Sequence, residues 1–119
     1  DSSSREVVDR VKAHITEGAT TLVLLDSNHS KAHVLKELEA YHGLVSPGSY
    51  IVATDGLMRD LHDVPRGAPD WEWNNPAAAA EEFARSHPEF VIEQPAWPFS
   101  ESELTENVTH WPSAWLRRV

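Results

Sequence analysis

Apolar residues in this chain alternate between short continuous runs and helical stripes, a pattern typical of an α/β domain. Residues 20–25 and 50–53 are continuous runs of β-branched, aliphatic and aromatic residues, which favour strands buried on both faces of a parallel sheet. Between these runs an apolar stripe at helical spacing predicts a helix that Ser30 caps and Gly43 ends; the stripe is Val34, Leu35, Leu38 and Tyr41. Strand, helix and strand together predict a right-handed βαβ unit.

Two further helices are predicted outside this unit. Ser3 as N-cap, with Glu6 three residues later, forms a capping box that opens a helix over about residues 4–16. Asn75 followed by Pro76 supplies an N-cap and a proline at the first helical position, so a helix is expected over residues 77–86.

The remaining segments are short strands and long loops. Strands are expected at residues 90–93 and 107–119, the second interrupted at Pro112 because proline favours an edge, bulge or bend. Residues 56–75 and 95–106 lack periodicity and are predicted to be loops, and loops of such length are usually functional or disordered.

Size and composition indicate one ordinary globular domain and narrow its partners. The chain has 119 residues, no cysteine and a formal net charge of −9. The acidic balance argues against a nucleic-acid partner, and no apolar run has the length of a membrane span. We therefore expect a small-molecule partner and a cytoplasmic location, the latter only because the lack of cysteine suits a reducing compartment.

Polar side chains follow both strands of the predicted βαβ unit. Asp26 follows the first strand, His29 lies at the turn into the helix, and Asp55 follows the second strand. The carboxyl ends of parallel strands meet at one edge of a sheet, which is where α/β folds place ligands. Two carboxylates at that edge suit a divalent cation with oxygen ligands, and a histidine beside them can act as a general base.

Structural roles for the same residues remain open at this stage. Aspartates after strands often cap the next helix or turn, and a lone histidine is usually a hydrogen-bonded surface group. Trp71 and Trp73 in the first long loop argue against disorder there, and they also suit a small satellite core. The other histidines are interpreted as surface or structural residues, namely His14, His33, His42, His62, His87 and His110.

The sequence resembles one enzyme family. Three of its segments are similar to the cephalosporin hydroxylase family, which groups with rhamnosyl and macrolide-sugar O-methyltransferases. They are Leu-Leu-Asp-Ser-Asn-His-Ser at residues 24–30, Leu-Val-Ser-Pro-Gly-Ser-Tyr-Ile-Val at residues 44–52 and Trp-Leu-Arg-Arg-Val at residues 115–119. The resemblance covers almost the whole chain and is strongest over residues 21–56.

The resemblance implies a fold, and it implies that this chain forms only part of that fold. The family has a seven-stranded, Rossmann-like methyltransferase sheet, and the strands here would be the fourth to the seventh, with the last antiparallel. Residues 1–119 would then be a single partial domain, the C-terminal half of that α/β fold.

The resemblance also implies an active site. It assigns Asp26 as the first ligand of Mg²⁺ or a similar divalent cation, and the next acidic pair falls on Thr54 and Asp55. Thr54 departs from the pattern, since a hydroxyl is a neutral and weaker ligand than a carboxylate. His29 matches the base of the related sugar methyltransferases, and Trp71 and Trp73 would pack on the apolar face of the acceptor.

S-adenosylmethionine is the implied cofactor, yet its glycine-rich turn is not found here. None of the five glycines form a Gly-x-Gly, and only Asp1 and Ser2 are expected to contact the cofactor, as the tail of the loop at the adenine ring. The chain is therefore expected to lack the cofactor-binding half and to be inactive alone. A half-sheet leaves an open strand edge, so a homo-oligomer or association through the other half is expected.

Three functions are weighed. The first is a metal-assisted, S-adenosylmethionine-dependent O-methyltransferase acting on a sugar or a small hydroxylated metabolite. The second is a degenerate methyltransferase-like domain with an assembly role, in which Thr54 marks a decayed metal site. The third is a metal-dependent hydrolase, for which Glu93 is the only additional ligand available.

Overall fold

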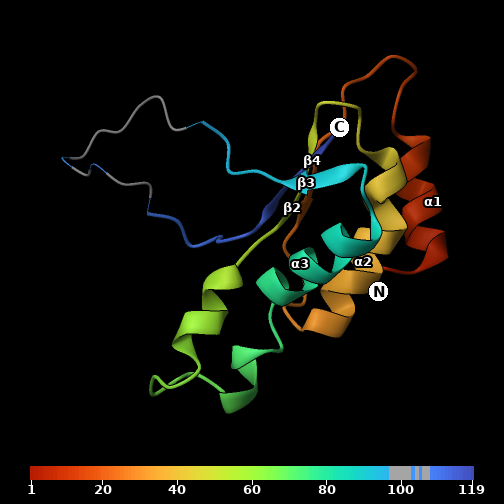
Figure 1. The fold of residues 1–119 in the computed structure, drawn as a ribbon. Helices are drawn as coiled ribbons and strands as arrows, with labels where there is room; N and C mark the ends of the chain where they lie inside the picture. The colour runs from red at the N-terminus through yellow and green to blue at the C-terminus, as the bar shows by residue number, and fades with distance from the viewer. Residues whose placement is uncertain (97–102, 104, 106–107) are drawn as a thin grey trace.

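The protein folds around one open sheet of mixed direction, flanked by helices (Figure 1). The computed structural model describes residues 1–96, 103, 105 and 108–119. Within these residues the sheet has four strands in the order β1-β2-β4-β3. The strands are β1 (Val23–Leu25), β2 (Tyr50–Ala53), β3 (Phe90–Ile92) and β4 (Trp115–Arg118).

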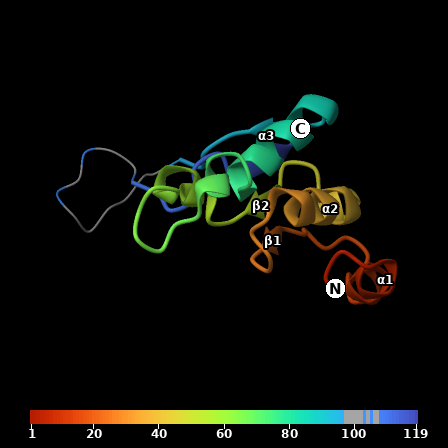
Figure 2. The same ribbon diagram turned by 90° about the horizontal axis from the view of Figure 1, so that it is seen from below.

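Three α-helices and three short 3₁₀ helices connect the strands. The α-helices are α1 (Arg5–Ala13), α2 (Lys31–Tyr41) and α3 (Pro76–Ser86), and the 3₁₀ helices are η1 (His42–Leu44), η2 (Gly56–Leu61) and η3 (Pro69–Glu72). Helices α2 and α3 pack against each other, and α1 lies beyond α2 at the margin of the molecule (Figure 2). None of the helices in the described ranges has the length and apolar character to cross a membrane.

The predicted βαβ unit is confirmed. Strands β1 and β2 are parallel, with Val23 opposite Ile51 and Leu25 opposite Ala53, and α2 connects them. The expectation that the last strand is antiparallel is also confirmed, because β4 runs antiparallel to both β2 and β3. The carboxyl ends of β1 and β2 therefore share one edge of the sheet.

The first strand differs from its prediction. It covers only residues 23–25 instead of residues 20–25, and it is not buried on both faces, since Leu22 and Leu24 are 52% and 51% exposed. In the described sheet β1 is the outermost strand and pairs only with β2. A continuous apolar run thus indicated a strand correctly but overestimated how much of it is covered.

The first helix begins and ends differently from its prediction. Its N-cap is Ser4, whose Oγ accepts a hydrogen bond from the Val7 amide. The amide and hydroxyl of Ser3 instead donate to the Asp1 carboxylate, at 2.9 and 2.7 Å. The helix ends at Ala13, and none of its residues is buried. The helix therefore packs only partially on the rest of the protein, with Val8 against the edge of the core.

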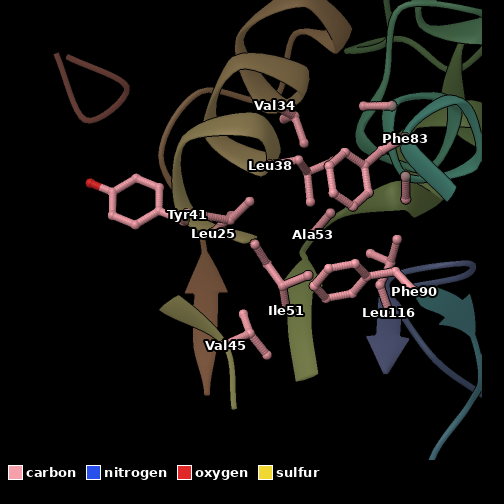
Figure 3. Packing of buried hydrophobic residues seen from close by; sticks show 12 residues of the cluster. Leu25, Val34, Leu38, Tyr41, Val45, Ile51, Ala53, Phe83, Phe90 and Leu116 are labelled. Carbon is pink, nitrogen blue, oxygen red and sulfur yellow. The ribbon is translucent and has the colours of Figure 1, made fainter. Parts of the chain in front are cut away.

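The core lies between helices α2 and α3 and one face of the sheet (Figure 3). Figure 3 shows Leu38 of α2 and Phe83 of α3 above Ile51 of β2, with Leu116 of β4 beside them. All four side chains are fully buried. This packing fixes the two parallel strands and the start of α2, which are the elements that carry the predicted site.

The second half of the chain shows two further differences, and one prediction there is left untested. The predicted loop over residues 56–75 contains η2 and η3. The last strand is limited to β4, because the chain turns at Pro112 and Ser113 with a positive φ of 56° at Ser113. The predicted loop at residues 95–106 and the start of the predicted strand at residue 107 lie largely outside the described residues.

Candidate functional site

The structure brings Asp26, His29 and Asp55 together at the carboxyl edge of β1 and β2. Nε2 of His29 lies 3.4 Å from Oδ1 of Asp26 and 3.3 Å from Oδ2 of Asp55. The side chains are 60%, 30% and 42% exposed in the order Asp26, His29 and Asp55. The three residues thus offer donor atoms around one point that solvent reaches.

A short turn after β1 holds His29 in this position. The Asn28 side chain accepts a hydrogen bond from the Ser30 amide at 2.9 Å, which closes an Asx turn around His29. The Lys31 amide, in the first turn of α2, donates to Oδ1 of Asn74 at 2.8 Å. The turn is therefore fixed locally and also tied to the segment that precedes α3.

Asp55 reaches the site through an unusual backbone conformation. Its φ of 58° and ψ of 26° are left-handed, a region that aspartate and asparagine tolerate better than most other residues. The next residue must be small, because a Cβ on Gly56 would lie 2.7 Å from the carbonyl oxygen of Pro112. The sharp turn at residues 55–56 directs the Asp55 carboxylate back toward His29.

Thr54 holds the Asp26 carboxylate through a hydrogen bond. Its side chain is buried, and its hydroxyl lies 3.0 Å from both the Leu25 carbonyl oxygen and Oδ1 of Asp26, donating to this pair. The hydroxyl proton is therefore engaged within the protein, and Thr54 orients the carboxylate that the sequence analysis assigned as a ligand. The Thr54 amide also donates to the Leu25 carbonyl, at 3.2 Å.

The imidazole of His29 approaches both carboxylates through the same nitrogen, Nε2. This arrangement suits proton removal from a hydroxyl, because carboxylates beside a histidine stabilise its protonated form. It also suits a hard divalent cation, since carboxylate oxygens that solvent reaches are the ligands such ions prefer.

A mostly apolar cavity of about 350 Å³ opens beside His29 and Asp55. Its remaining walls are Leu57, Met58, Leu61, Trp71 and His110. Trp71 therefore lines a cavity that His29 and Asp55 also line. Trp73 does not line this cavity and is 64% exposed, so the structure separates the two tryptophans.

Four of these wall residues were not predicted. Leu57, Met58 and Leu61 belong to η2, a helix without a recognisable apolar period, and His110 was interpreted as a surface or structural residue. His110 reaches the cavity because its carbonyl accepts a hydrogen bond from the Leu57 amide at 3.2 Å. That contact joins segments far apart in the sequence, so no local signal could have revealed it.

A second hollow, of about 460 Å³, lies along β1. Ser2, Asp26, Ser27 and Glu37 are among the polar residues that line it, and most of its other walls are apolar residues of β1 and of the segments beside it. The Asp26–His29–Asp55 group therefore has one cavity beside Asp26 and another beside His29 and Asp55.

A buried carboxylate in the wall of this second hollow was also not predicted. Glu37 is 2% exposed and accepts a hydrogen bond from Ser27 at 2.8 Å, while its carboxylate lies 3.5 Å from Nε2 of His33. Burial, and then the charge of Glu37, raise the pKa of Tyr41. The signal was present in the sequence, because Glu37 shares the buried face of α2 with the predicted apolar stripe.

Ser2 belongs to this network, whereas Asp1 does not. The Ser2 hydroxyl lies 3.1 Å from Nε2 of His33, and its carbonyl accepts a hydrogen bond from Tyr41 at 2.7 Å. The Asp1 carboxylate instead caps the turn at Ser3. Of the two residues expected to contact a cofactor, the structure places only Ser2 beside a cavity.

The extra ligand required by a hydrolase does not join the group. The Glu93 carboxylate accepts a hydrogen bond from Nε of Arg117 at 2.9 Å, on the antiparallel side of the sheet. Within the described residues, the cluster that can hold a metal at the carboxyl edge contains only Asp26, His29 and Asp55.

Comparison with known proteins gave one match. The model of the family described as rhamnosyl O-methyltransferase/CmcI matches residues 1–119, which is the whole chain. Searches of curated proteins and of solved structures found no match.

Proposed function

Since this chain belongs to the rhamnosyl O-methyltransferase/CmcI family, we propose that it transfers the methyl group of S-adenosylmethionine to a hydroxyl group. Membership supports an enzyme of the O-methyltransferase type. The acceptor we propose is a sugar or another small hydroxylated metabolite, because the cavity beside His29 combines polar groups at one end with apolar walls. The metal assistance and the residue roles below belong to the same proposal.

His29 is the general base of the proposed reaction. An acceptor hydroxyl is a poor nucleophile until its proton leaves, and an imidazole at the mouth of the cavity is well placed to take that proton. The acceptor oxygen forms a bond to the methyl carbon as the bond from that carbon to sulfur breaks. The carboxylates of Asp26 and Asp55, both within 3.4 Å of Nε2, then stabilise the imidazolium.

Asp26 and Asp55 also fit a divalent cation, with Thr54 as the residue that orients Asp26. When bound, Mg²⁺ or a similar ion would lower the pKa of the acceptor hydroxyl and fix its position. Both carboxylates are exposed enough for water to complete the coordination that a hard cation requires. Thr54 keeps its proton on Asp26 and the Leu25 carbonyl, so the protein supplies two charged oxygen ligands instead of three.

In this proposal each of the two hollows takes one of the two reactants. Trp71 packs on the acceptor in the cavity beside His29 and Asp55, while the cofactor lies toward Ser2 and Asp26 on the other side. The remaining cofactor contacts come from residues outside these 119, either from elsewhere in the polypeptide or from a second copy in a homo-oligomer. The observation that carries the proposal is the meeting of one histidine and two carboxylates between the two hollows.

Replacing His29 tests the proposal most simply. We expect His29→Ala in the full protein to lower methyl transfer from radiolabelled S-adenosylmethionine by about 10²- to 10⁴-fold across a panel of sugar acceptors. Affinity for the cofactor, measured by calorimetry, should not change. His14→Ala is the matched control, because His14 is exposed and lies at the end of α1.

Two outcomes would count against the proposal. Unchanged turnover in His29→Ala would remove His29 as the base. Absence of cofactor binding by the unmodified protein, with and without Mg²⁺, would instead favour a degenerate domain with an assembly role.

A further inference from the structure

A second group of metal-ligating side chains lies away from the proposed active site. Glu39, His42 and His87 each offer one ligand atom, and these atoms all lie within 4.8 Å of one another. Glu39 and His42 are three residues apart at the end of α2, and His87 is the C-cap of α3. Because α2 leaves the carboxyl end of β1 and returns to the start of β2, the group lies at the opposite edge of the sheet.

Both imidazoles have one nitrogen engaged by a backbone carbonyl. Nδ1 of His42 lies 2.9 Å from the Glu39 carbonyl oxygen, and Nδ1 of His87 lies 3.1 Å from the Phe83 carbonyl oxygen. A carbonyl only accepts hydrogen bonds, so these contacts favour the neutral form of each ring in which Nδ1 carries the proton and Nε2 keeps its lone pair. A backbone hydrogen bond of this kind usually fixes the orientation of metal-binding histidines.

Nε2 of His87 faces a carboxylate at a distance that suits a shared cation. It lies 3.5 Å from Oε2 of Glu39. A lone pair and a carboxylate oxygen that face each other need a positive group between them, either a proton or a metal ion. Zinc bonds of about 2.0–2.1 Å at tetrahedral angles separate two ligand atoms by about 3.3 Å, close to the distance found here.

Aromatic packing holds the two imidazoles in place before any ion binds. The ring of His87 stacks on the fully buried ring of Phe83, with centroids 3.8 Å apart and planes inclined by 12°. The His42 ring packs against Phe83, at 5.7 Å, and lies 5.0 Å from the His87 ring. The last turns of two helices also carry partial negative charge, which favours a cation there.

We propose that Glu39, His42 and His87 form a structural transition-metal site, best suited to Zn²⁺, that joins the ends of α2 and α3. Two imidazole nitrogens and one carboxylate oxygen are a ligand set that Zn²⁺ accepts, with a water in the fourth position. Nitrogen ligands disfavour Mg²⁺, so this site does not suit the ion proposed for the carboxylates of Asp26 and Asp55. The site links the two helices that cover the core, at the edge away from the acceptor cavity.

Zinc titration of the full protein after treatment with EDTA tests this proposal. Calorimetry should show Zn²⁺ binding that persists in His29→Ala, and saturating Zn²⁺ should raise the melting temperature by about 5 °C. Glu39→Gln and His87→Phe should each weaken this binding more than about tenfold. His87→Phe keeps an aromatic ring on Phe83, and Glu39 is 54% exposed, so both variants should fold.

Two controls separate loss of zinc binding from loss of folding: the melting temperature without metal, and a variant of a histidine outside the site. Glu39→Gln should melt like the unmodified protein in EDTA, and His14→Ala should retain the full response to zinc. The proposal is overturned if zinc has no effect on the unmodified protein, or if Glu39→Gln and His87→Phe respond to zinc as it does. It is overturned equally if His29→Ala alone abolishes zinc binding.

Discussion

At the scale of single residues, Thr54 shows how a substituted ligand position acquires another role. The resemblance placed a carboxylate at this position, and the structure places there a buried hydroxyl that donates to Asp26 and to the Leu25 carbonyl. A second carboxylate this close to Asp26 would repel it unless a cation were always present. The threonine instead fixes the orientation of Asp26 without adding charge.

Thr54→Val should therefore loosen Asp26 while keeping the shape of the side chain. We expect the free energy of unfolding to fall by about 1 kcal/mol, because the Thr54 amide still satisfies the Leu25 carbonyl. Affinity for divalent cations should fall as well. Chemical denaturation and calorimetry measure the two effects, and Thr21→Val is the control because no hydrogen bond of its hydroxyl is found in the described part of the chain. Equal results for both variants would argue against the positioning role of Thr54.

Gly56 is the second residue whose identity the geometry restricts. A Cβ there would lie 2.7 Å from the Pro112 carbonyl oxygen and 3.0 Å from Cβ of Ala77, so Gly56→Ala forces the backbone to move. We expect a loss of about 1–3 kcal/mol in the free energy of unfolding. In urea denaturation Gly43→Ala should show no such loss, because a Cβ at Gly43 meets nothing within 4 Å. A fully stable Gly56→Ala protein would contradict this close approach.

At the scale of elements, the caps of α2 and α3 differ although both follow the same sequence rule. Asn75 is fully buried, and its side chain accepts from the Ala78 amide at 2.8 Å and donates to the Trp71 carbonyl at 2.8 Å. Ser30 occupies the corresponding position of α2 but makes no side-chain capping bond. Asn75 thus joins α3 to the loop that carries Trp71.

Asn75→Ala should therefore be costly and Ser30→Ala should not. Loss of the cap and of the bond to Trp71 is expected to lower the free energy of unfolding by about 2–3 kcal/mol. Ser30→Ala should change it by less than about 0.5 kcal/mol. Equilibrium denaturation of the two variants compares them directly, and similar losses would mean that the contacts of Asn75 contribute little.

An ion pair between α2 and α3 gives a prediction about pH. Nζ of Lys31 lies 2.6 Å from Oε2 of Glu82, and its hydrogen bond and charge hold the pKa of Glu82 below its usual value of 4.5. A pKa lowered in the folded state contributes stability above the unfolded value. That contribution disappears as the pH falls through the folded value.

In the unmodified protein, the free energy of unfolding should therefore fall as the pH drops below about 4.5. In Glu82→Gln this fall should be smaller, and the pH dependence above that range should be the same as in the unmodified protein. Urea denaturation of the variant and of the unmodified protein, repeated across the acidic range, gives the comparison. Glu17→Gln is the control, because Glu17 is exposed. If the acid slope of Glu82→Gln equals that of the unmodified protein, the ion pair does not contribute.

The part of the site that lies at strand ends could be predicted from the sequence, and the part that distant segments form could not. The positions of Asp26 and Asp55 followed from two strand ends, since parallel neighbours bring their carboxyl ends to one edge. The cavity walls in η2 and at His110 could not be predicted, because contacts between distant segments place them. The apolar run at β1 indicated a strand, but a run of letters does not show which of its faces remains exposed.

At the scale of the whole molecule, the proposed chemistry lies at one edge of the sheet and the proposed zinc site at the other. Helices α2 and α3 connect the two edges and cover the core between them. In the described sheet β1 pairs on one side only; Leu24 within it and Leu22 just before it are half exposed. This is the side on which we propose that the remaining cofactor contacts are supplied.

Electron paramagnetic resonance of Mn²⁺ shows whether Asp26 and Asp55 hold a divalent cation beside His29, as we propose. The full protein should remove free Mn²⁺ from solution at this site, and the double variant Asp26→Asn/Asp55→Asn should not. Asparagine preserves the side-chain size and tolerates the left-handed backbone of residue 55. The exposed pair Asp60→Asn/Asp63→Asn should bind as the unmodified protein does. Mn²⁺ binding that survives in Asp26→Asn/Asp55→Asn would mean that these two carboxylates are not the ligands of the cation.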